Sequence, residues 1–303
     1  MLGIFKGNMY FQRKGFCLKD LITFSFLLFI AAGFFLNRVY SQTEKEGING
    51  TIGKGGIADS KASFTGRHIE NRAFGIGEKL YFSVNYGPIN AGHTVMSIHE
   101  IKEINGARCY SISSVVESNK FFSRFYKVRD VVRTYIDVEG LFPWRYEKHL
   151  REGKYVFDYE VDFDQKIRLA YSNFPNSSDR DTAQVPEFIQ DALSALYYVR
   201  TQPLEVGISL LIPVHDNGKI YDLEVKVYRK EKVKVGAGRF SCFVIEPLLK
   251  SIGIFKKKGR LTIWISDDGR GLPVLMKSKV IIGSITAELE EFVPGSGILN
   301  SNP

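Results

Sequence analysis

The chain has 303 residues, of which 44% are hydrophobic and 13% aromatic; this supports one large folded domain or two small ones and excludes a largely disordered chain. Its formal net charge is +8, but half of that excess lies in residues 1–41. The basic charge is therefore typical of a targeting signal followed by an ordinary surface, and we expect no nucleic-acid partner.

Residues 1–41 have the pattern of an export signal. A basic region ends at Lys19, an uncharged apolar stretch covers Leu21–Leu36, and the compact residues Val39 and Ser41 precede a cleavage point. A helix over the apolar stretch would rise about 24 Å, short of the roughly 30 Å of a bilayer core. We therefore predict a cleaved signal peptide at 1–41 and a periplasmic location, with an uncleaved anchor as the alternative.

The next segments divide the rest of the chain. Residues 42–72 are rich in glycine and follow no apolar period, which predicts a flexible tether. The tail at 294–303 has a similar composition and is expected to be disordered. The range between them, 73–293, is predicted to form a single β-rich domain.

Strand patterns dominate this domain, and glycine, proline or Asn–Asp pairs separate many of them. Asn217-Gly218 and Asp268-Gly269 are predicted hairpin turns, because glycine tolerates a positive φ at no steric cost. The pattern predicts a mainly β fold, a large curved antiparallel sheet or partly open barrel with one central helix packed on it. The predicted strands are Lys79–Tyr86, Thr94–Ile101, Arg108–Glu117, Asp130–Asp137, Trp144–Arg151, Tyr155–Phe163, Ile167–Tyr171, Leu210–Pro213, Tyr221–Lys232, Phe240–Glu246, Gly259–Ser266, Val274–Val280 and Ser284–Phe292.

One hairpin has two chemically different faces. With a turn at Glu152-Gly153, Arg145 would face Glu160 and Glu147 would face Asp158. The opposite face is aromatic and aliphatic, with one lysine, Lys148, among its members. We call the ionisable side the charged face; its members are Arg145, Glu147, His149, Arg151, Asp158, Glu160, Asp162 and Asp164.

A helix is predicted over Pro186–Arg200, because proline suits a first turn and the apolar residues after it follow helical spacing. It would act either as a lid over a cavity or as a plug on one face of the sheet. After signal cleavage two cysteines remain, Cys109 and Cys242. We expect either two buried free thiols in neighbouring strands or a disulfide, which an exported protein could form.

Catalytic and metal-binding motifs are not apparent. His99-Glu100 begins an HExxE pattern, which lacks the second histidine of a zinc helix and lies in a predicted strand. We therefore predict that the chain is not an enzyme and needs no cofactor or metal. The basic run Lys256–Lys258 with Arg260 could meet anionic lipid or form an exposed turn.

Several separated blocks, FFSRFYKVRD (121–130), LFPWRYEKHLREGKY (141–155), VPEFIQDALSALYYVRT (185–201) and the stretch at 259–292, resemble an exported bacterial family, domain of unknown function number 3108. The resemblance covers about 73–293 and implies a periplasmic β-rich domain without assigning an activity or catalytic residues. The predicted architecture is also similar, more loosely, to periplasmic lipoprotein carriers, whose curved sheet wraps an apolar cavity.

Three functions remain open. The first is a non-catalytic binding module for a lipid or other apolar ligand. The second is a structural or assembly factor that contacts an envelope protein through the charged face, and the third is a hydrolase using Glu147 and His149. Peripheral membrane contact is compatible with the sequence, and the oligomeric state is left open. Candidate ligand-binding residues are Trp144, Tyr146, Tyr159, Phe188, Leu196 and Trp264, and candidate polar contacts are Arg145, Glu147, His149 and Arg151.

Overall fold

A computed structural model describes residues 66–175, 180–249, 260–279 and 283–296. The predicted signal peptide, most of the predicted tether, the basic run at Lys256–Lys258 and the end of the tail lie outside these residues. Residues 66–72 of the predicted tether and residues 294–296 of the predicted tail are among the described residues. The backbone N–H of Ile69 donates to the carbonyl oxygen of Glu139 (2.8 Å), and that of Ser296 donates to Ile76 (2.7 Å).

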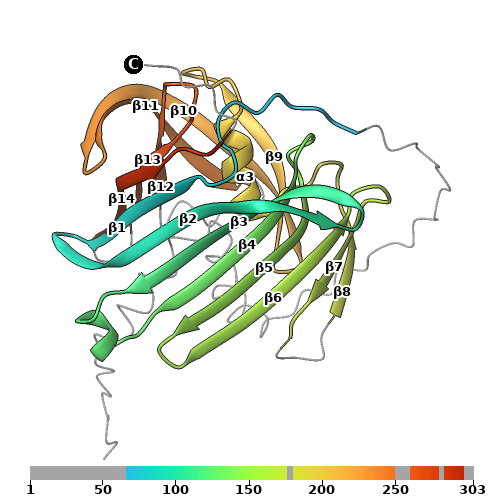
Figure 1. The fold of residues 1–303 in the computed structure, drawn as a ribbon, viewed down its shortest axis with the longest axis horizontal. Coiled ribbons are helices and arrows are strands. Elements are labelled where there is room, and N and C mark those ends of the chain that lie inside the picture. Colours follow the sequence, from blue (N-terminus) through green and yellow to red (C-terminus); the bar gives the residue numbers. More distant parts are fainter. Residues whose placement is uncertain (1–65, 176–179, 250–259, 280–282, 297–303) are drawn as a thin grey trace, which may run out of the picture.

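The described residues form one 14-stranded antiparallel sheet, which confirms the predicted fold class (Figure 1). The strand order is β8-β7-β6-β5-β4-β3-β2-β1-β14-β13-β12-β11-β10-β9, so two meanders meet where β1 pairs with β14. The strands are β1 (Lys79–Tyr86), β2 (Ile89–Ile104), β3 (Ala107–Ser118), β4 (Arg129–Asp137), β5 (Pro143–Glu152), β6 (Tyr155–Asp164), β7 (Leu169–Asn173), β8 (Arg180–Gln184), β9 (Ser209–Asp216), β10 (Lys219–Val235), β11 (Gly238–Leu249), β12 (Leu261–Ser266), β13 (Pro273–Lys279) and β14 (Ser284–Val293).

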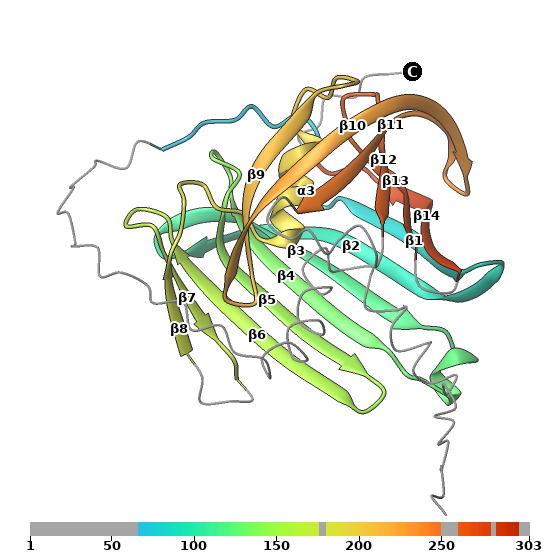
Figure 2. The same cartoon turned by 180° about the vertical axis from the view of Figure 1, so that it is seen from behind.

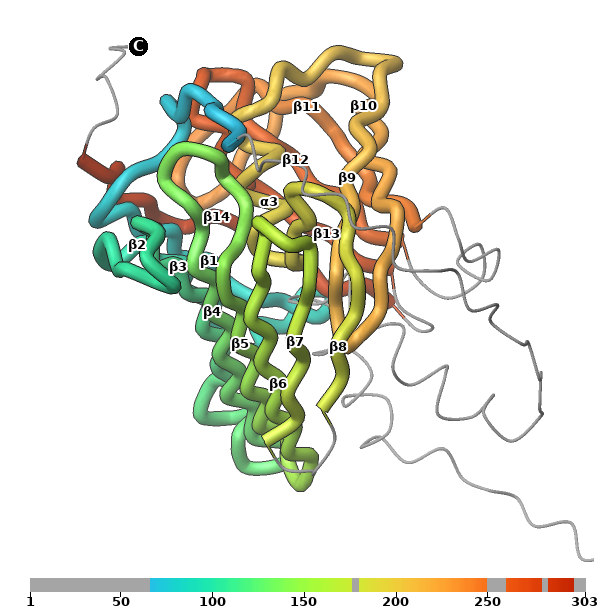
Figure 3. The backbone as a smooth tube through the Cα atoms, turned by 90° about the vertical axis from the view of Figure 1, so that its right-hand side faces the viewer, coloured from blue at the N-terminus to red at the C-terminus, as the bar shows by residue number. Residues whose placement is uncertain are grey.

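The sheet curves around a single α-helix of the described chain, α3 (Ala192–Arg200), which lies inside the curve (Figures 2 and 3). Register shifts leave Glu290 of β14, Tyr228 of β10 and Val274 of β13 as extra residues in bulges, which bend strands and increase their twist. The β10–β11 hairpin curls over β14, and the N–H of Ala237 near its tip donates to Leu289 (2.9 Å). We call the side of the sheet that faces α3 the inner face.

The two edge strands, β8 and β9, are not paired with each other. The segment before α3 lies along β9 instead, because Gln190 donates to Pro213 (2.9 Å) and accepts from the N–H of His215 (2.8 Å). The β9–β10 turn also contacts the other meander, where the N–H of Gly218 donates to the Tyr159 hydroxyl (3.1 Å). We call this set of side-chain and loop contacts the seam; it brings the ends of the sheet together without completing a barrel.

Two predicted boundaries were wrong for local reasons. The helix begins at Ala192, not Pro186, because Phe188 has φ +55° and the side chain of Asp191 caps the helix. The β5–β6 turn is Gly153-Lys154, with Glu152 facing Tyr155, because Gly153 takes the first turn position with φ +59°. This moves each partner in β6 by two residues, so Glu147 faces Glu160, and the charged and apolar faces stay as predicted.

The Asn217-Gly218 turn is confirmed, since both residues have positive φ and Asp216 faces Lys219. Cys109 and Cys242 are buried free thiols. They lie on β3 and β11, which are separated by other strands, so their predicted placement in neighbouring strands was wrong.

Candidate functional site

A cavity of about 100 Å³ lies between α3 and the inner face of the sheet. Leu193, Leu196 and Val199 of α3 point into it at spacings of three residues, which places them on one side of the helix. The opposite wall comes from both meanders. The lining residues from the sheet are Thr94, Met96, Ser114, Val116, Leu223, Val225, Ile245, Pro247, Leu261, Ile263 and Met276.

The wall of this cavity is almost entirely hydrocarbon. Thr94 and Ser114 supply its only side-chain oxygens, and the Thr94 hydroxyl donates to the carbonyl oxygen of Val115 (2.9 Å). No ionisable side chain lines it. Leu196, Pro247 and Leu261 are half-buried, so the cavity approaches the surface beside them. Such a site can take up apolar atoms but offers no charged partner to a polar group.

The predicted ligand-binding residues do not converge on this cavity. Leu196 lines it, whereas Tyr146 and Tyr159 are fully buried in the core with ring centroids 6.4 Å apart. Trp144 and Phe188 belong to a separate cluster around Phe142, at ring distances of 5.8 and 5.5 Å.

Trp264 is also buried, and its indole N–H donates to Glu231 rather than to a group in the cavity. Sequence reasoning did not find the sheet residues that line the cavity, such as Met96, Val225 and Ile263. Alternation marks these positions as inward-facing. Only the strand order and the curvature of the sheet bring them together, and no local signal carries that information.

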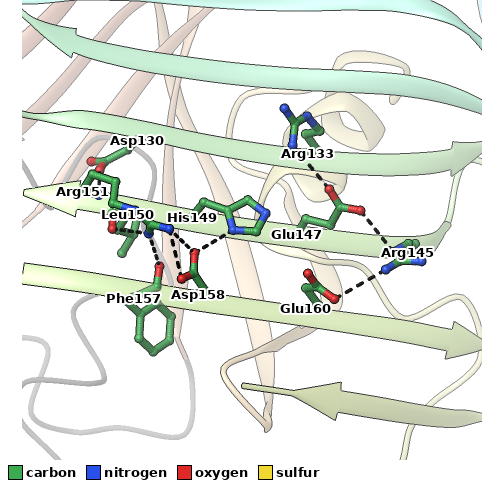
Figure 4. Close-up of polar contacts among 10 residues, drawn as sticks. All are labelled: Asp130, Arg133, Arg145, Glu147, His149, Leu150, Arg151, Phe157, Asp158 and Glu160. Carbon is green, nitrogen blue, oxygen red and sulfur yellow. Dashed lines mark hydrogen bonds and ion pairs between the residues drawn. The ribbon is translucent and has the colours of Figure 1, made fainter. Parts of the chain in front are cut away.

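The charged face lies on the outer side of β5 and β6, and Arg133 of β4 joins it (Figure 4). Arg145 lies 3.1 Å from Glu147 and 3.5 Å from Glu160, and Arg133 lies 3.5 Å from Glu147. At the other end of the hairpin, Asp158 contacts two cationic or titratable groups. Its carboxylate accepts two hydrogen bonds from Arg151 (2.8 and 3.0 Å) and contacts Nδ1 of His149 at 2.7 Å.

Both arginines of this hairpin are therefore paired with carboxylates of the same hairpin. Glu147 is engaged by Arg133 and Arg145, whereas His149 is engaged by Asp158, so the two proposed hydrolase residues have different partners. A general base needs a nucleophile or substrate proton within hydrogen-bond reach. This geometry is that of an ion-pair ladder on a partly solvated sheet face.

A second polar cluster is enclosed in the core at the seam. The Lys148 ammonium lies 2.6 Å from the Asp216 carboxylate, and both side chains are 1% exposed. The Tyr159 hydroxyl contacts Ser172 (3.1 Å) and Nδ1 of His215 (3.4 Å). Burial lowers the pKa of Lys148, while Asp216 opposes that shift, and burial lowers the pKa of His215 to about 4. The cluster joins β5 and β6 to the β9–β10 hairpin, and none of these side chains lines the cavity.

Asp191 holds the first turn of α3 from inside the protein. One carboxylate oxygen accepts from the N–H groups of Leu193 and Ser194 (both 2.8 Å), and the other accepts from the Thr134 hydroxyl (2.6 Å). Complete burial raises the pKa of Asp191 to about 6 despite these hydrogen bonds. An unfolded aspartate has a pKa of about 4, so protonation favours the folded state.

Replacing Asp191 by asparagine is expected to change how stability depends on pH. The stabilisation from protonating Asp191 is complete below about pH 4 and is lost as the pH rises through about 6. The amide keeps the cap but carries no charge. The free energy of unfolding of Asp191→Asn, relative to the parent, should therefore improve by up to about 3 kcal/mol between pH 4 and pH 7. Urea unfolding at both pH values measures this, with Asp191→Ser as a second uncharged cap. An equal difference at both pH values would contradict it.

Among residues 66–175, 180–249, 260–279 and 283–296, no group of three or more His, Cys, Asp or Glu side chains is arranged to hold a metal ion. Within the same residues, no helix is both long enough and apolar enough to cross a membrane.

An open antiparallel sheet curved around a helix and an apolar cavity places the chain among β-barrel-like proteins. The model of a family of proteins of unknown function, DUF3108, matches residues 81–290, and the chain belongs to this family. A search of curated proteins gave no match.

Solved structures include a fold relative of this protein. A β-barrel-like DUF1849 protein from Brucella abortus aligns with a TM-score of 0.51 and 8% identity, over 73% of this chain and 99% of its own. A Parabacteroides distasonis protein, provisionally described as a lipoprotein, has a TM-score of 0.27 and 10% identity, with coverages of 76% and 100%. A Bacteroides fragilis protein with a YmcC-like fold, provisionally described as exported, has a TM-score of 0.28 and 12% identity. That alignment covers 76% of this chain and 100% of the Bacteroides fragilis chain. The first alignment supports the fold.

Proposed function

We propose that this chain is an exported, non-catalytic binding module of the cell envelope that holds a small apolar group, such as the end of an acyl chain, in the cavity beneath α3. The observation that carries the proposal is the hydrocarbon wall of that cavity, built from α3 and from both meanders. The signal pattern at residues 1–41 supports export to the periplasm.

The chemistry of the wall limits the ligand class. Apolar cavities of this order, lined by aliphatic side chains, stay dry and take up molecules of about the size of benzene. Filling the space restores dispersion contacts that the lining atoms of Met96, Val225 and Ile263 otherwise lack. A ligand with a charged group would have to keep that group at the surface, beside Leu196 and Leu261, because no side chain of the cavity can pair with it.

The positions of the ionisable groups favour binding over catalysis. Lys148, Asp216 and His215 are enclosed in the core, and the charged face lies on the opposite side of the sheet from the cavity. The alternative proposal is an envelope-protein contact through Arg145 and Arg151. It requires both arginines to leave the carboxylates that they already contact and to pair with groups of the partner instead. In-cell crosslinking that is unchanged after charge reversal at both positions would count against that surface.

Filling the cavity with a larger side chain is expected to abolish ligand binding. Leu196→Trp adds volume where α3 faces the cavity and should lower the amount of co-purifying apolar ligand at least tenfold in native mass spectrometry. Tyr198→Trp is the matched control, because Tyr198 lies on the same helix but outside the cavity and contacts Arg67. Displacement of a fluorescent fatty acid gives a second measurement. Equal ligand content in the two variants, or none in the parent, would contradict the proposal.

A further inference from the structure

The connection between β3 and β4, residues 119–128, projects two phenylalanines into water. Phe121 is 62% exposed and Phe125 is 66% exposed, and their ring centroids lie 5.6 Å apart. Phe122, between them, packs against the small cluster that contains Val116. We call this segment, with its short 3-10 helix η1 (Phe122–Arg124), the aromatic tip. Single exposed apolar residues are ordinary, but adjacent exposed aromatic rings mark interaction sites.

The aromatic tip is held in place by its own polar groups. The side chain of Asn119 accepts from the N–H of Phe122 (2.9 Å) and donates to the carbonyl oxygen of Asn90 (2.7 Å). The hydroxyl of Ser118 accepts from the N–H of Val128 (2.9 Å) and contacts the hydroxyl of Ser123 (2.8 Å). The phenylalanines are therefore presented to water by a hydrogen-bonded frame.

Two neighbouring turns extend the surface. The N–H of Gly153 in the β5–β6 turn donates to the carbonyl oxygen of Lys127 (2.7 Å), and Val156 beyond that turn is 55% exposed. Asn90, which accepts from the aromatic tip, follows the exposed Ile89 in the β1–β2 hairpin. Three hairpin connections at one end of the sheet thus contact one another, and each carries exposed apolar side chains.

The charge around this apolar end is basic. Lys120, Arg124, Lys127 and Lys154 are exposed, and within the described part of the chain none of them forms an ion pair with a carboxylate. The nearby Glu117 is instead engaged by Arg129, at 3.2 Å. The arginines of the charged face, in contrast, are all paired.

We propose that the aromatic tip inserts Phe121 and Phe125 into the surface of a membrane that contains anionic phospholipid, with Lys120, Arg124 and Lys127 contacting the headgroups. Aromatic side chains favour the interfacial region, and each basic residue near an anionic surface adds attraction. This surface is independent of the proposed ligand. Val116 nevertheless lines the cavity two residues before β3 ends, so insertion brings that end of the cavity towards the lipid.

The insertion is tested locally with Phe125→Trp in the full chain. The native Trp144 and Trp264 are buried, so they give a constant background. Phosphatidylglycerol vesicles should shift the emission of the new tryptophan to the blue, and brominated lipid should quench it. Leu211→Trp is the matched control, since Leu211 is 60% exposed on the edge strand β9, and it should keep its emission in water. This readout reports the aromatic tip even where another segment binds the vesicle.

Charge and apolar contributions are separated by two further variants. Phe121→Ser with Phe125→Ser should weaken vesicle partitioning about tenfold or more. Replacing Lys120, Arg124 and Lys127 by glutamine should weaken binding to phosphatidylglycerol about 100-fold at low salt and leave the weak binding to phosphatidylcholine unchanged. The proposal is overturned when Phe125→Trp shows no shift with bound vesicles, or when Leu211→Trp is quenched to the same extent.

Discussion

Replacing Lys148 by methionine is expected to lower the free energy of unfolding at pH 7 by about 3–5 kcal/mol, because it leaves the Asp216 carboxylate in the core without its cation. The ammonium of Lys148 also lies 5.7 Å from the ring centroid of Tyr159, and this contact is lost as well. Methionine keeps most of the side-chain volume, so packing changes little. Urea unfolding followed by circular dichroism measures the difference.

The control removes both charges. Lys148→Met combined with Asp216→Leu leaves no buried ion, so we expect it to regain most of the stability that Lys148→Met loses. Because the pair joins β5 to the end of β9, the single variant should also increase amide exchange on the edge strand β9. If the double variant is no more stable than the single one, the loss comes from packing and the electrostatic explanation fails.

Replacing Arg200 by methionine is also expected to lower the free energy of unfolding by about 3–5 kcal/mol. Arg200 makes a bidentate ion pair with the buried Glu78, with two hydrogen bonds of 2.7 Å each, and the substitution leaves that carboxylate unpaired. Its guanidinium also donates to the carbonyl oxygens of Ala73 (3.2 Å) and Arg270 (3.3 Å). One side chain thus joins the C-terminal end of α3 to the start of β1 and to the β12–β13 loop. Thermal and urea unfolding should both report the loss.

An exposed ion pair provides the comparison for this variant. Arg129 contacts Glu117 at 3.2 Å on the surface, so Arg129→Met should change stability by less than about 1 kcal/mol. Combining Glu78→Gln with Arg200→Met removes the uncompensated carboxylate and should recover part of the loss. Equal effects of Arg200→Met and Arg129→Met would mean that burial of the pair does not determine its contribution.

Much of the fold was predictable because strand alternation is a local property. Lys79–Tyr86 was predicted with the bounds of β1, and the inward face of β5, including Lys148, was assigned correctly although the turn was misplaced. β8 was missed because its sequence, RDTAQ, is polar and mostly exposed at the sheet edge. The helix start was misplaced because the helical spacing does not show that the segment at Gln190 pairs with β9.

The candidate site was much less predictable. Trp144, Phe188 and Leu196 were grouped because they are large and apolar, yet only Leu196 of the three lines the cavity. Asp216 is 68 residues from Lys148 in the sequence, and nothing in either local pattern indicates their contact. Such pairs depend on how far the whole sheet curves, which is a property of many strands together.

The order of the strands has a consequence for how the protein folds. Within each meander, every strand pairs with a sequence neighbour, so β1–β8 and β9–β14 can each form by closing short loops. The ladder between β1 and β14 joins residues as distant as Lys79 and Val293, which are 214 positions apart. Because β14 is the last described strand in the sequence, it emerges after every other described strand, and the two half-sheets keep unpaired edges until it arrives. We expect this late docking to limit the folding rate and to be the stage most exposed to aggregation.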